Sequence, residues 1–361
     1  MSELHIRQAT LADKPALFDF LRLAYLDRWQ SKFPERWEWE FEHNPFLRGN
    51  DLPIWIAVDG DRVVGQSCAL VEPLVVHGKE YRVGWGVDFF VLPEYRGQGL
   101  GTRLQQANNA GNDIFMSLSM AASAAHIKSN IGLQPLPPVP VFTKIIHHEP
   151  ESVLQTLAKR TKLPEILLRG AGLHHLGAGL LTARDARRDR GRIILPAGGV
   201  ELIPVQQFGP EVDDLWARVS GKFSALVRRD SEYLNWKFAR QPHAEHQRVI
   251  AQRNGQACGF VIFRQTRPPE RNAGLILDMF ADPKDDIIRV LLAYATHQLR
   301  ERKVTYVQAA SSVREFQQVF VALGFKQTKT ATPMIRAGVA IPQEGWLLGK
   351  GDHDWDQFPL A

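Results

Sequence analysis

The chain has 361 residues, of which 44% are hydrophobic and 23% are charged. This balance is ordinary for a folded soluble protein with room for two domains, and it excludes a disordered chain. The net charge of +5 is spread too thinly along the sequence to indicate nucleic-acid binding. The two cysteines exclude a disulfide framework and a cysteine-rich zinc site, and both fit buried strands.

The first residues, MSELHIRQAT, show the pattern of a strand and lack the apolar core of a signal peptide. The chain contains no run of about 18 apolar residues, so no transmembrane helix is expected. We therefore expect a cytoplasmic protein.

The sequence contains two copies of one pattern, one in each half. WEFEHNP at residues 39–45 is repeated as WKFARQP at 236–242, and DFFVLP at 88–93 is repeated as DMFADP at 278–283. The repeat predicts a duplicated domain. Each copy also contains a hairpin pattern around a turn dipeptide, Asp59-Gly60 in the first and Asn254-Gly255 in the second.

A glycine-rich loop follows the strand predicted for residues 85–92. Its sequence, RGQGLG at 96–101, leads into the helical segment TRLQQANNAG. A helix that begins directly after such a loop offers unpaired backbone N–H groups and the positive end of its dipole to an anion. The spacing fits neither the Walker phosphate loop nor the dinucleotide-binding GxGxxG. We expect the loop to expose its backbone to the pyrophosphate of another ligand.

The segment VLPEYRGQGLGTRL at 91–104 resembles the hallmark of the GNAT superfamily of acyl-CoA-dependent N-acyltransferases, V-x-P-x-x-[RQ]-G-x-G-[LIA]-[GA]-x-x-L. The family's order of elements extends over residues 5–146 and again over 200–335, and the whole is similar to tandem-GNAT proteins of bacteria. The resemblance implies an α/β (α+β) fold with two tandem GNAT-like domains, each a mixed, mostly antiparallel sheet flanked by helices. The matching motif residues are Val91, Pro93, Arg96, Gly97, Gly99, Leu100, Gly101 and Leu104.

By this resemblance, residues 1–150 form a GNAT domain with an intact acyl-CoA-binding motif, 151–196 a helical linker, and 197–361 a second GNAT-like domain with a degenerate motif. In the second copy, Asp285 and Asp286 stand where the phosphate would bind, and their charge would repel it. We expect the second domain not to bind CoA in this mode and to form a wall of the acceptor cleft instead.

The resemblance also implies which residues hold the co-substrate, acetyl-CoA or another acyl-CoA; no metal is implied. The amides from Gln98 to Thr102 would hold the pyrophosphate, and the strand backbone from Phe90 to Leu92 would pair with the pantetheine arm. Arg96 either adds charge at a phosphate or braces the loop. The predicted cofactor-binding set is Phe90, Val91, Leu92, Arg96, Gly97, Gln98, Gly99, Leu100, Gly101 and Thr102.

Acyl transfer to an amine requires a proton to leave the amine and another to reach the thiolate. Asp88 lies on the strand where the family places its base, but Asp278 holds the same position in the copy without the CoA motif, so a structural role stays open. The family's tyrosine proton donor is replaced by Lys128 in the first copy and Phe320 in the second. Further candidates, which equally fit structural positions, are Ser129, Asn130, His126, Ser117 and Ser119.

Two other segments carry unusual composition. Residues 151–190 end in a run of charges and fit either an interfacial helix on anionic lipid or, as we expect, a connecting helix with a solvated end. The adjacent histidines at 147–148 and 174–175 lack the i, i+4 spacing of a metal site on a helix. The ending GDHDWDQFP, with Asp352 and Asp354, is expected to be a solvated tail, with attraction of a cationic amine as the alternative.

The resemblance implies an N-acyltransferase, in the first place an N-acetyltransferase, that works by direct attack of an amine in a ternary complex in the N-terminal domain. The absence of a cysteine near the motif argues against a covalent intermediate. The acceptor stays open among an amino sugar, a polyamine, an amino-acid derivative and a protein amine, and the resemblance to bacterial tandem proteins favours an amino sugar. The alternatives are a non-catalytic acyl-CoA-binding sensor or scaffold, and a peptidyl transferase using aminoacyl-tRNA, which the intact loop disfavours.

Overall fold

The structure is a computed structural model, and it describes residues 4–49, 52–119, 128–162, 164–170, 172–190, 199–242, 244–266 and 272–354. The chain divides into two compact units, and each draws on both halves of the sequence. Unit 1 comprises Met1–Val139, Gln207–Glu245 and Thr330–Trp355, and unit 2 comprises Pro140–Gln206, His246–Lys329 and Asp356–Ala361. These units are discontinuous along the chain, whereas the sequence prediction placed its boundaries near residues 150 and 196.

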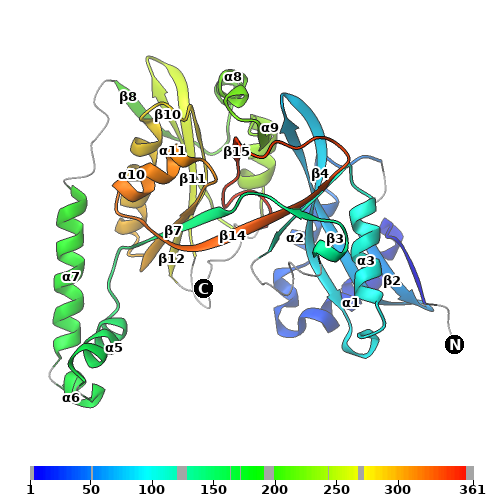
Figure 1. Cartoon of the computed structure of the whole chain (residues 1–361), viewed down its shortest axis with the longest axis horizontal. Coiled ribbons are helices and arrows are strands. Elements are labelled where there is room, and N and C mark those ends of the chain that lie inside the picture. The colour runs from blue at the N-terminus through cyan, green and yellow to red at the C-terminus, as the bar shows by residue number, and fades with distance from the viewer. Residues whose placement is uncertain are drawn as a thin grey trace. The chain divides into compact units, whose positions relative to one another are not determined.

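Unit 1 is built on a mixed sheet in the order β1-β2-β3-β4-β5-β14 (Figure 1). Neighbouring strands from β1 to β4 are antiparallel, β4 and β5 are parallel, and β5 and β14 are antiparallel. Turn glycines such as Gly60, at φ +61°, join the first strands as hairpins. The strands are β1 (His5–Gln8), β2 (Ile54–Asp59), β3 (Arg62–Val76), β4 (Lys79–Val91), β5 (Ile114–Ser119) and β14 (Lys326–Ala337), with the two-residue β6 (Gln134–Pro135) on β14.

Helices of the first half cover this sheet: α1 (Lys14–Tyr25), α2 (Glu35–Phe41) and α3 (Leu100–Ala110), with short 3-10 turns at Leu11–Asp13, Leu26–Ser31 and Pro93–Tyr95. α3 packs on β2, β3 and β4 through the fully buried Leu104. A Cβ added at Gly65 of β3 would lie 3.0 Å from Leu104 Cδ1. The small residue therefore lets the motif helix approach the sheet closely.

Unit 1 also contains a segment from the second half: α8 (Pro210–Val219), a 3-10 turn at Ser220–Lys222, β9 (Ala225–Val227), α9 (Ser231–Leu234) and the π-helical turn Asn235–Ala239. β9 pairs with the end of β3 and with β15 (Trp346–Leu347). The duplicated motifs meet here, because the rings of Trp39 and Trp236 stack at 5.0 Å. Each indole N–H donates to the carbonyl of the other tryptophan, at 2.9 and 3.3 Å. The second copy of the motif therefore packs on the first.

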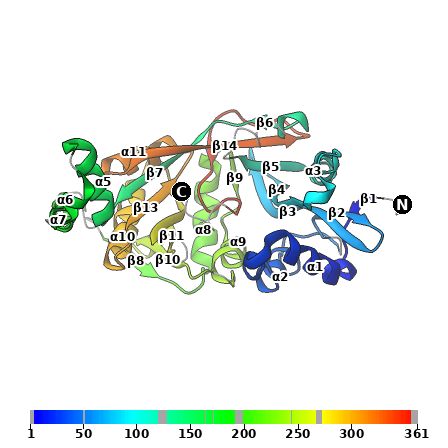
Figure 2. The same ribbon diagram turned by 90° about the horizontal axis from the view of Figure 1, so that it is seen from below.

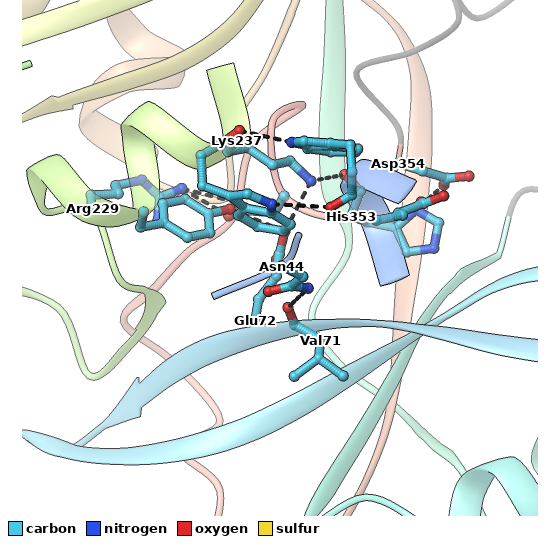
Figure 3. A network of polar contacts seen from close by, with 12 residues as sticks. Asn44, Val71, Glu72, Arg229, Lys237, His353 and Asp354 are labelled. Carbon is cyan, nitrogen blue, oxygen red and sulfur yellow. Dashed lines mark hydrogen bonds and ion pairs between the residues drawn. The ribbon is translucent and has the colours of Figure 1, made fainter. Parts of the chain in front are cut away.

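A buried polar network holds the C-terminal segment against unit 1 (Figure 3). Lys237 Nζ donates to Glu72 Oε1 and to the carbonyl of His353, both at 2.9 Å. Arg229 binds both carboxylate oxygens of Asp352 at 3.0 Å. Asp352 is only 3% exposed and residues 351–353 are buried, so the expectation of a solvated tail is wrong there; Trp355 and Asp356, which belong to the same predicted tail, lie outside the described residues. The reason is that buried cations pair with this segment, and a buried charge without a partner would be costly.

Unit 2 repeats the order of elements seen in unit 1. Its sheet runs β7-β13-β12-β11-β10-β8, with β12 and β13 parallel and the other neighbours antiparallel. The strands are β7 (Val139–Ile145), β8 (Val200–Pro204), β10 (Gln247–Arg253), β11 (Gln256–Gln265), β12 (Ala273–Ala281) and β13 (Tyr306–Ala310). The helices on it are α10 (Ile287–Glu301) and α11 (Arg314–Ala322), and α10 packs on β11 and β12.

The last strands of the two halves are exchanged. β7, from the first half, pairs with β13 in unit 2, while residues 332–337 of β14, from the second half, pair with β5 in unit 1 (Figure 2). Each sheet is therefore completed by a strand from the other half of the sequence.

Most of the described residues between 150 and 190 lie in three helices, as the sequence predicted: α5 (Pro150–Thr161), α6 (Glu165–Gly170) and α7 (Leu173–Arg190). We call these three helices the arm; Figure 1 shows it in green beside the sheet of unit 2. The C-terminal part of α7 is anchored, because the buried Asp189 pairs with Lys144 at 2.8 Å and with Arg300. Among the described helices, none is both long and apolar enough to cross a membrane.

Candidate active site

The glycine loop connects β4 to α3, and two of its glycines adopt conformations that other residues rarely take. Gly97 has φ +79°, and Gly99, the N-cap of α3, has φ +71°. A Cβ added at either position would meet no atom within 4 Å. The backbone conformation, rather than crowding, therefore requires glycine, and the space above the loop is open. The first amides of α3 point into this space because they precede the first helical hydrogen bonds.

Arg96 braces the loop. Its Nε donates to the carbonyl of Val91 at 2.9 Å, and its guanidinium lies 5.1 Å from the centre of the Phe90 ring. The bracing role that the sequence left open is thus present in the structure. The side chain is nevertheless exposed at the loop surface, where its charge adds to the positive end of the α3 dipole.

A β-bulge in β4 sets the orientation of Asp88. Gln66 of β3 lies opposite Phe90 and Cys68 lies opposite Val87, so Asp88 and Phe89 together face one residue of β3. Asp88 has φ +44°, and its carbonyl accepts a hydrogen bond from Gln66 Nε2 at 3.1 Å. A bulge of this kind turns a side chain out of the regular alternation of a strand, and bulges are common beside active sites.

Asp278, the counterpart of Asp88 in the second half, has a different backbone. It lies directly opposite Ile262 in the β11–β12 ladder and is absent from the residues with positive φ in the described part of the chain. The two aspartates match in sequence but not in conformation. The repeat therefore no longer argues that Asp88 has a purely structural role.

The carboxylate of Asp88 is ionised at neutral pH. Its Oδ1 accepts from Lys32 Nζ at 2.5 Å and from the Tyr25 hydroxyl at 3.1 Å. Burial acts to raise the pKa of Asp88, but the charges of Lys32 and Arg36 outweigh burial and leave that pKa below its usual value. A carboxylate of this kind attracts cations strongly and is a weak proton acceptor.

A pocket of about 310 Å³ lies where β4 and β5 separate. The two strands pair only along residues 83–85 and 114–116, and the pocket opens beyond this ladder. Polar side chains from β3, β4, α3, β5, the segment after β5 and the C-terminal segment line it: Ser67, Asp88, Gln105, Ser117, Lys128, His353 and Asp354.

His353 and Asp354 reach the pocket because the network of Figure 3 holds the segment just before them. His353 Nε2 lies 3.1 Å from the Gly86 carbonyl, and its Nδ1 forms an ion pair with Asp354. Burial acts to lower the pKa of His353, but Asp354 outweighs it and raises that pKa. The pair therefore resembles an imidazolium and a carboxylate. Nothing in the local sequence pattern showed that these residues fold back to the strand preceding the glycine loop.

Lys128 is the basic group of the pocket. Burial lowers the pKa of its ammonium to about 8, although the charge of Asp354 acts in the opposite direction. Its neighbours Ser129 and Asn130 are exposed and are not among the residues that line the pocket, and the Ser129 carbonyl accepts the N–H of Gly132 at 3.0 Å. His126 and the side chain of Ser119 lie outside the described residues.

The corresponding junction of the second half, between β12 and α10, is occupied by its own side chains. Asp285 Oδ1 accepts the N–H of Ile287 at 3.3 Å in the first turn of α10. Arg253 binds Asp285 at 3.0 and 3.2 Å and Asp286 at 3.2 Å. One of the first N–H groups of α10 is therefore satisfied by Asp285, and two carboxylates stand where the α3 junction is open. Within the described ranges, no group of three or more His, Cys, Asp or Glu residues is placed to hold a metal ion.

Residues 15–107 match the model of the Acetyltransferase (GNAT) family. The first half of the chain thus contains a region that matches the GNAT acetyltransferase domain. No curated protein matches its sequence.

Solved structures show the same fold at low sequence identity. A GCN5-related N-acetyltransferase from Anabaena variabilis has 12% identity and a TM-score of 0.59, with 92% of this chain and 72% of that chain covered. A probable N-acyltransferase from Enterococcus faecalis has 11% identity and a TM-score of 0.59, with 93% and 72% covered. N-myristoyltransferase from Saccharomyces cerevisiae, with bound myristoyl-CoA, has 11% identity and a TM-score of 0.56, with 95% and 84% covered.

Proposed function

We propose that the chain transfers an acyl group, in the first place acetyl, from acyl-CoA to the amine of a small cationic acceptor at the site in unit 1. The observation that carries this proposal is the conjunction of an open helix N-terminus after Gly99 with a polar pocket at the end of the β4–β5 ladder. The first fits a pyrophosphate and the second fits the thioester and the amine. The halves are then tandem GNAT-like domains, of which only the first binds CoA.

In this proposal the amides from Gln98 to Thr102 hold the pyrophosphate. The pantetheine arm follows the backbone edge of β4 beyond Trp85, where β5 no longer pairs with that strand. The Leu92 amide already donates to the Val64 carbonyl at 3.0 Å, within the sheet. Because backbone groups of alternate residues face opposite sides of a strand, the pantetheine contact falls to Val91 rather than to Leu92.

Lys128 is the proposed proton donor. The acceptor's ammonium first releases one proton to water. The neutral amine nitrogen then attacks the thioester carbonyl, the C–S bond breaks, and the thiolate takes a proton from the Lys128 ammonium. The neutral lysine then takes the proton that the new amide nitrogen must lose, so one proton passes in total from nitrogen to sulfur. A pKa of about 8 for Lys128 lies close to that of an ordinary thiol, about 8.5, so neither transfer is strongly uphill.

Asp88 is proposed to hold the acceptor rather than to take its proton. Its lowered pKa makes it a weak base, whereas its carboxylate, although paired with Lys32, can accept an N–H hydrogen bond from an ammonium group in the pocket that it shares with Asp354. This favours a cationic acceptor, such as an amino sugar or a polyamine, over a neutral one.

Thermal unfolding with acetyl-CoA, CoA and a long-chain acyl-CoA tests the binding step. A ligand at hundredfold excess over its Kd stabilises the folded state by about 2.7 kcal/mol. The ligand giving the largest shift then serves as donor in a screen of amines, read as release of free thiol. The absence of any shift would contradict the proposal. Binding without thiol release with any amine would favour the non-catalytic sensor instead.

A further inference from the structure

The arm of unit 2 presents an apolar face to solvent. Five large aliphatic side chains on α6 and α7 are exposed by 49–78%: Ile166, Leu167, Leu173, Leu176 and Leu180. On α7 the spacing of three and then four residues places Leu173, Leu176 and Leu180 on one side of the helix. His174 and Ala178, on the other side, are buried. A contiguous exposed apolar face of this kind marks an interaction surface.

Cationic side chains border this face at both ends. Lys159 and Arg160 are exposed at the end of α5, just before α6, and Arg184 and Arg187 continue the leucine side of α7 toward its C-terminus. Among the described residues, no carboxylate forms an ion pair with Lys159, Arg160 or Arg187. The acidic side chains of α7 are engaged elsewhere: Asp185 with His148 and Arg184, and Asp189 with Lys144 and Arg300.

The arm is held in this form by contacts within unit 2. The His148 ring lies 3.0 Å from Asp185, and the His148 amide donates to Thr182 Oγ1 at 3.0 Å. These contacts and the buried Asp189 fix the C-terminal half of α7. The side of α7 that carries the leucines is therefore the side turned away from these anchors. The apolar face exists before any partner arrives.

We propose that the arm docks on an anionic phospholipid surface, with its aliphatic side chains among the lipid headgroups and its cations toward the phosphates. Exposed leucines along one side of the first half of α7, followed by Arg184 and Arg187 on the same side, have the composition for this mode of binding. A second copy of the chain is a poorer partner, because a symmetric contact would bring the same positive charges together. The proposal is independent of the acyl-transfer reaction.

Co-sedimentation of the full chain with vesicles tests the proposal, using phosphatidylcholine alone and phosphatidylcholine mixed with phosphatidylglycerol. We expect the protein to partition to the mixed vesicles and weakly to the neutral ones. Leu176→Gln with Leu180→Gln should lower partitioning by about tenfold or more. Lys159→Gln with Arg187→Gln should lower it roughly fivefold per charge at low salt.

The matched control is Leu11→Gln with Leu23→Gln, two leucines of unit 1 that are each 51% exposed. This variant should partition like the wild type. All variants should unfold at nearly the same temperature, because the replaced side chains are exposed. Partitioning of the wild type to neither vesicle, or equal partitioning of wild type and arm-leucine variant, overturns the proposal. So does a dimer that the arm-leucine variant dissociates in sedimentation velocity without vesicles.

Discussion

The junctions β4 to α3 and β12 to α10 occupy equivalent places in the two halves but present opposite surfaces to a ligand. The first is open, with Gly97 and Gly99 in left-handed conformations and exposed amides after them. At the second, Asp285 caps the helix and Arg253 covers the carboxylates. A few residues at a helix N-terminus thus decide whether its first N–H groups are open, as the proposed pyrophosphate site requires, or faced by carboxylates.

The strands that precede the two junctions differ as well. Asp88 sits in a bulge at φ +44° and lines the pocket, whereas Asp278 lies opposite Ile262, next to a register shift in the β11–β12 ladder, and is not among the described residues with positive φ. The identity of a residue in a repeat thus says less about its role than its backbone conformation does. The following predictions test this comparison.

Gly99→Glu should have the largest effect. The new side chain must adopt φ +71° and places a carboxylate where the pyrophosphate is proposed to bind. We expect acetyl-CoA binding to weaken by at least about a thousandfold, or ~4.1 kcal/mol, in titration calorimetry. Gly255→Glu, at φ +76° with no atom near its added Cβ, is the control for backbone strain. It should lower the unfolding temperature and keep acetyl-CoA affinity. Unchanged affinity in Gly99→Glu would refute the loop assignment.

Lys128→Met should reduce kcat about a hundredfold with little change in KM for acyl-CoA, because the thiolate loses its proton donor. Lys128 donates only in its protonated form, so wild-type kcat should fall as pH rises through about 8, and the variant should lack this fall. Lys79→Met, at an exposed lysine at the start of β4, is the control and should behave as the wild type. If kcat of the variant is a hundredfold lower but still falls as pH rises through about 8, Lys128 is excluded as the donor.

Asp88→Asn should raise KM for the amine about tenfold, because a charged hydrogen-bonding partner of the acceptor is lost. A fall in kcat with KM unchanged would instead identify Asp88 as the base.

Asp88→Asn should also destabilise the protein at neutral pH by roughly 3 kcal/mol, since Lys32 loses its buried partner. Because the folded pKa of Asp88 is lowered, its stabilising contribution is present above its unfolded pKa and is lost as pH falls through the folded value. Asp278→Asn should leave the amine KM unchanged.

Asp285→Ala should have the smallest effect. The loss of the cap at the start of α10 should cost about 1 kcal/mol in urea unfolding. The variant with both Asp285→Ala and Asp286→Ala should still fail to bind acetyl-CoA, because the loop lacks glycines. Binding of acetyl-CoA by this variant would show that the two carboxylates alone, and not the missing glycines, keep CoA from the β12–α10 junction.

Much of the fold could be predicted from the sequence, because the signals are local or periodic. The glycine spacing at 97–101 indicated the strand-to-helix junction and the family, and the repeated WxF motif indicated the duplication. The mixed, mostly antiparallel sheets flanked by helices are confirmed. The cofactor-binding residues stay a prediction, which the open geometry of the loop supports.

The parts that could not be predicted depend on long-range pairing. The bulge at Asp88 is visible only from the register between β3 and β4, and the exchange of β7 and β14 leaves no trace in local pattern. The burial of residues 351–353 depends on Arg229 and Lys237, which lie over a hundred residues earlier. A charged ending predicts a solvated tail unless its distant partners are known.

The exchanged strands have a consequence for synthesis on the ribosome. β5 has left the ribosome long before residues 332–337 of β14, its partner in unit 1, have been translated. For that interval the nascent chain carries an unpaired strand edge, which invites pairing with other chains. A chaperone that shields strand edges, or slow translation of the second half, would therefore act on the first half of this protein rather than on the part being made.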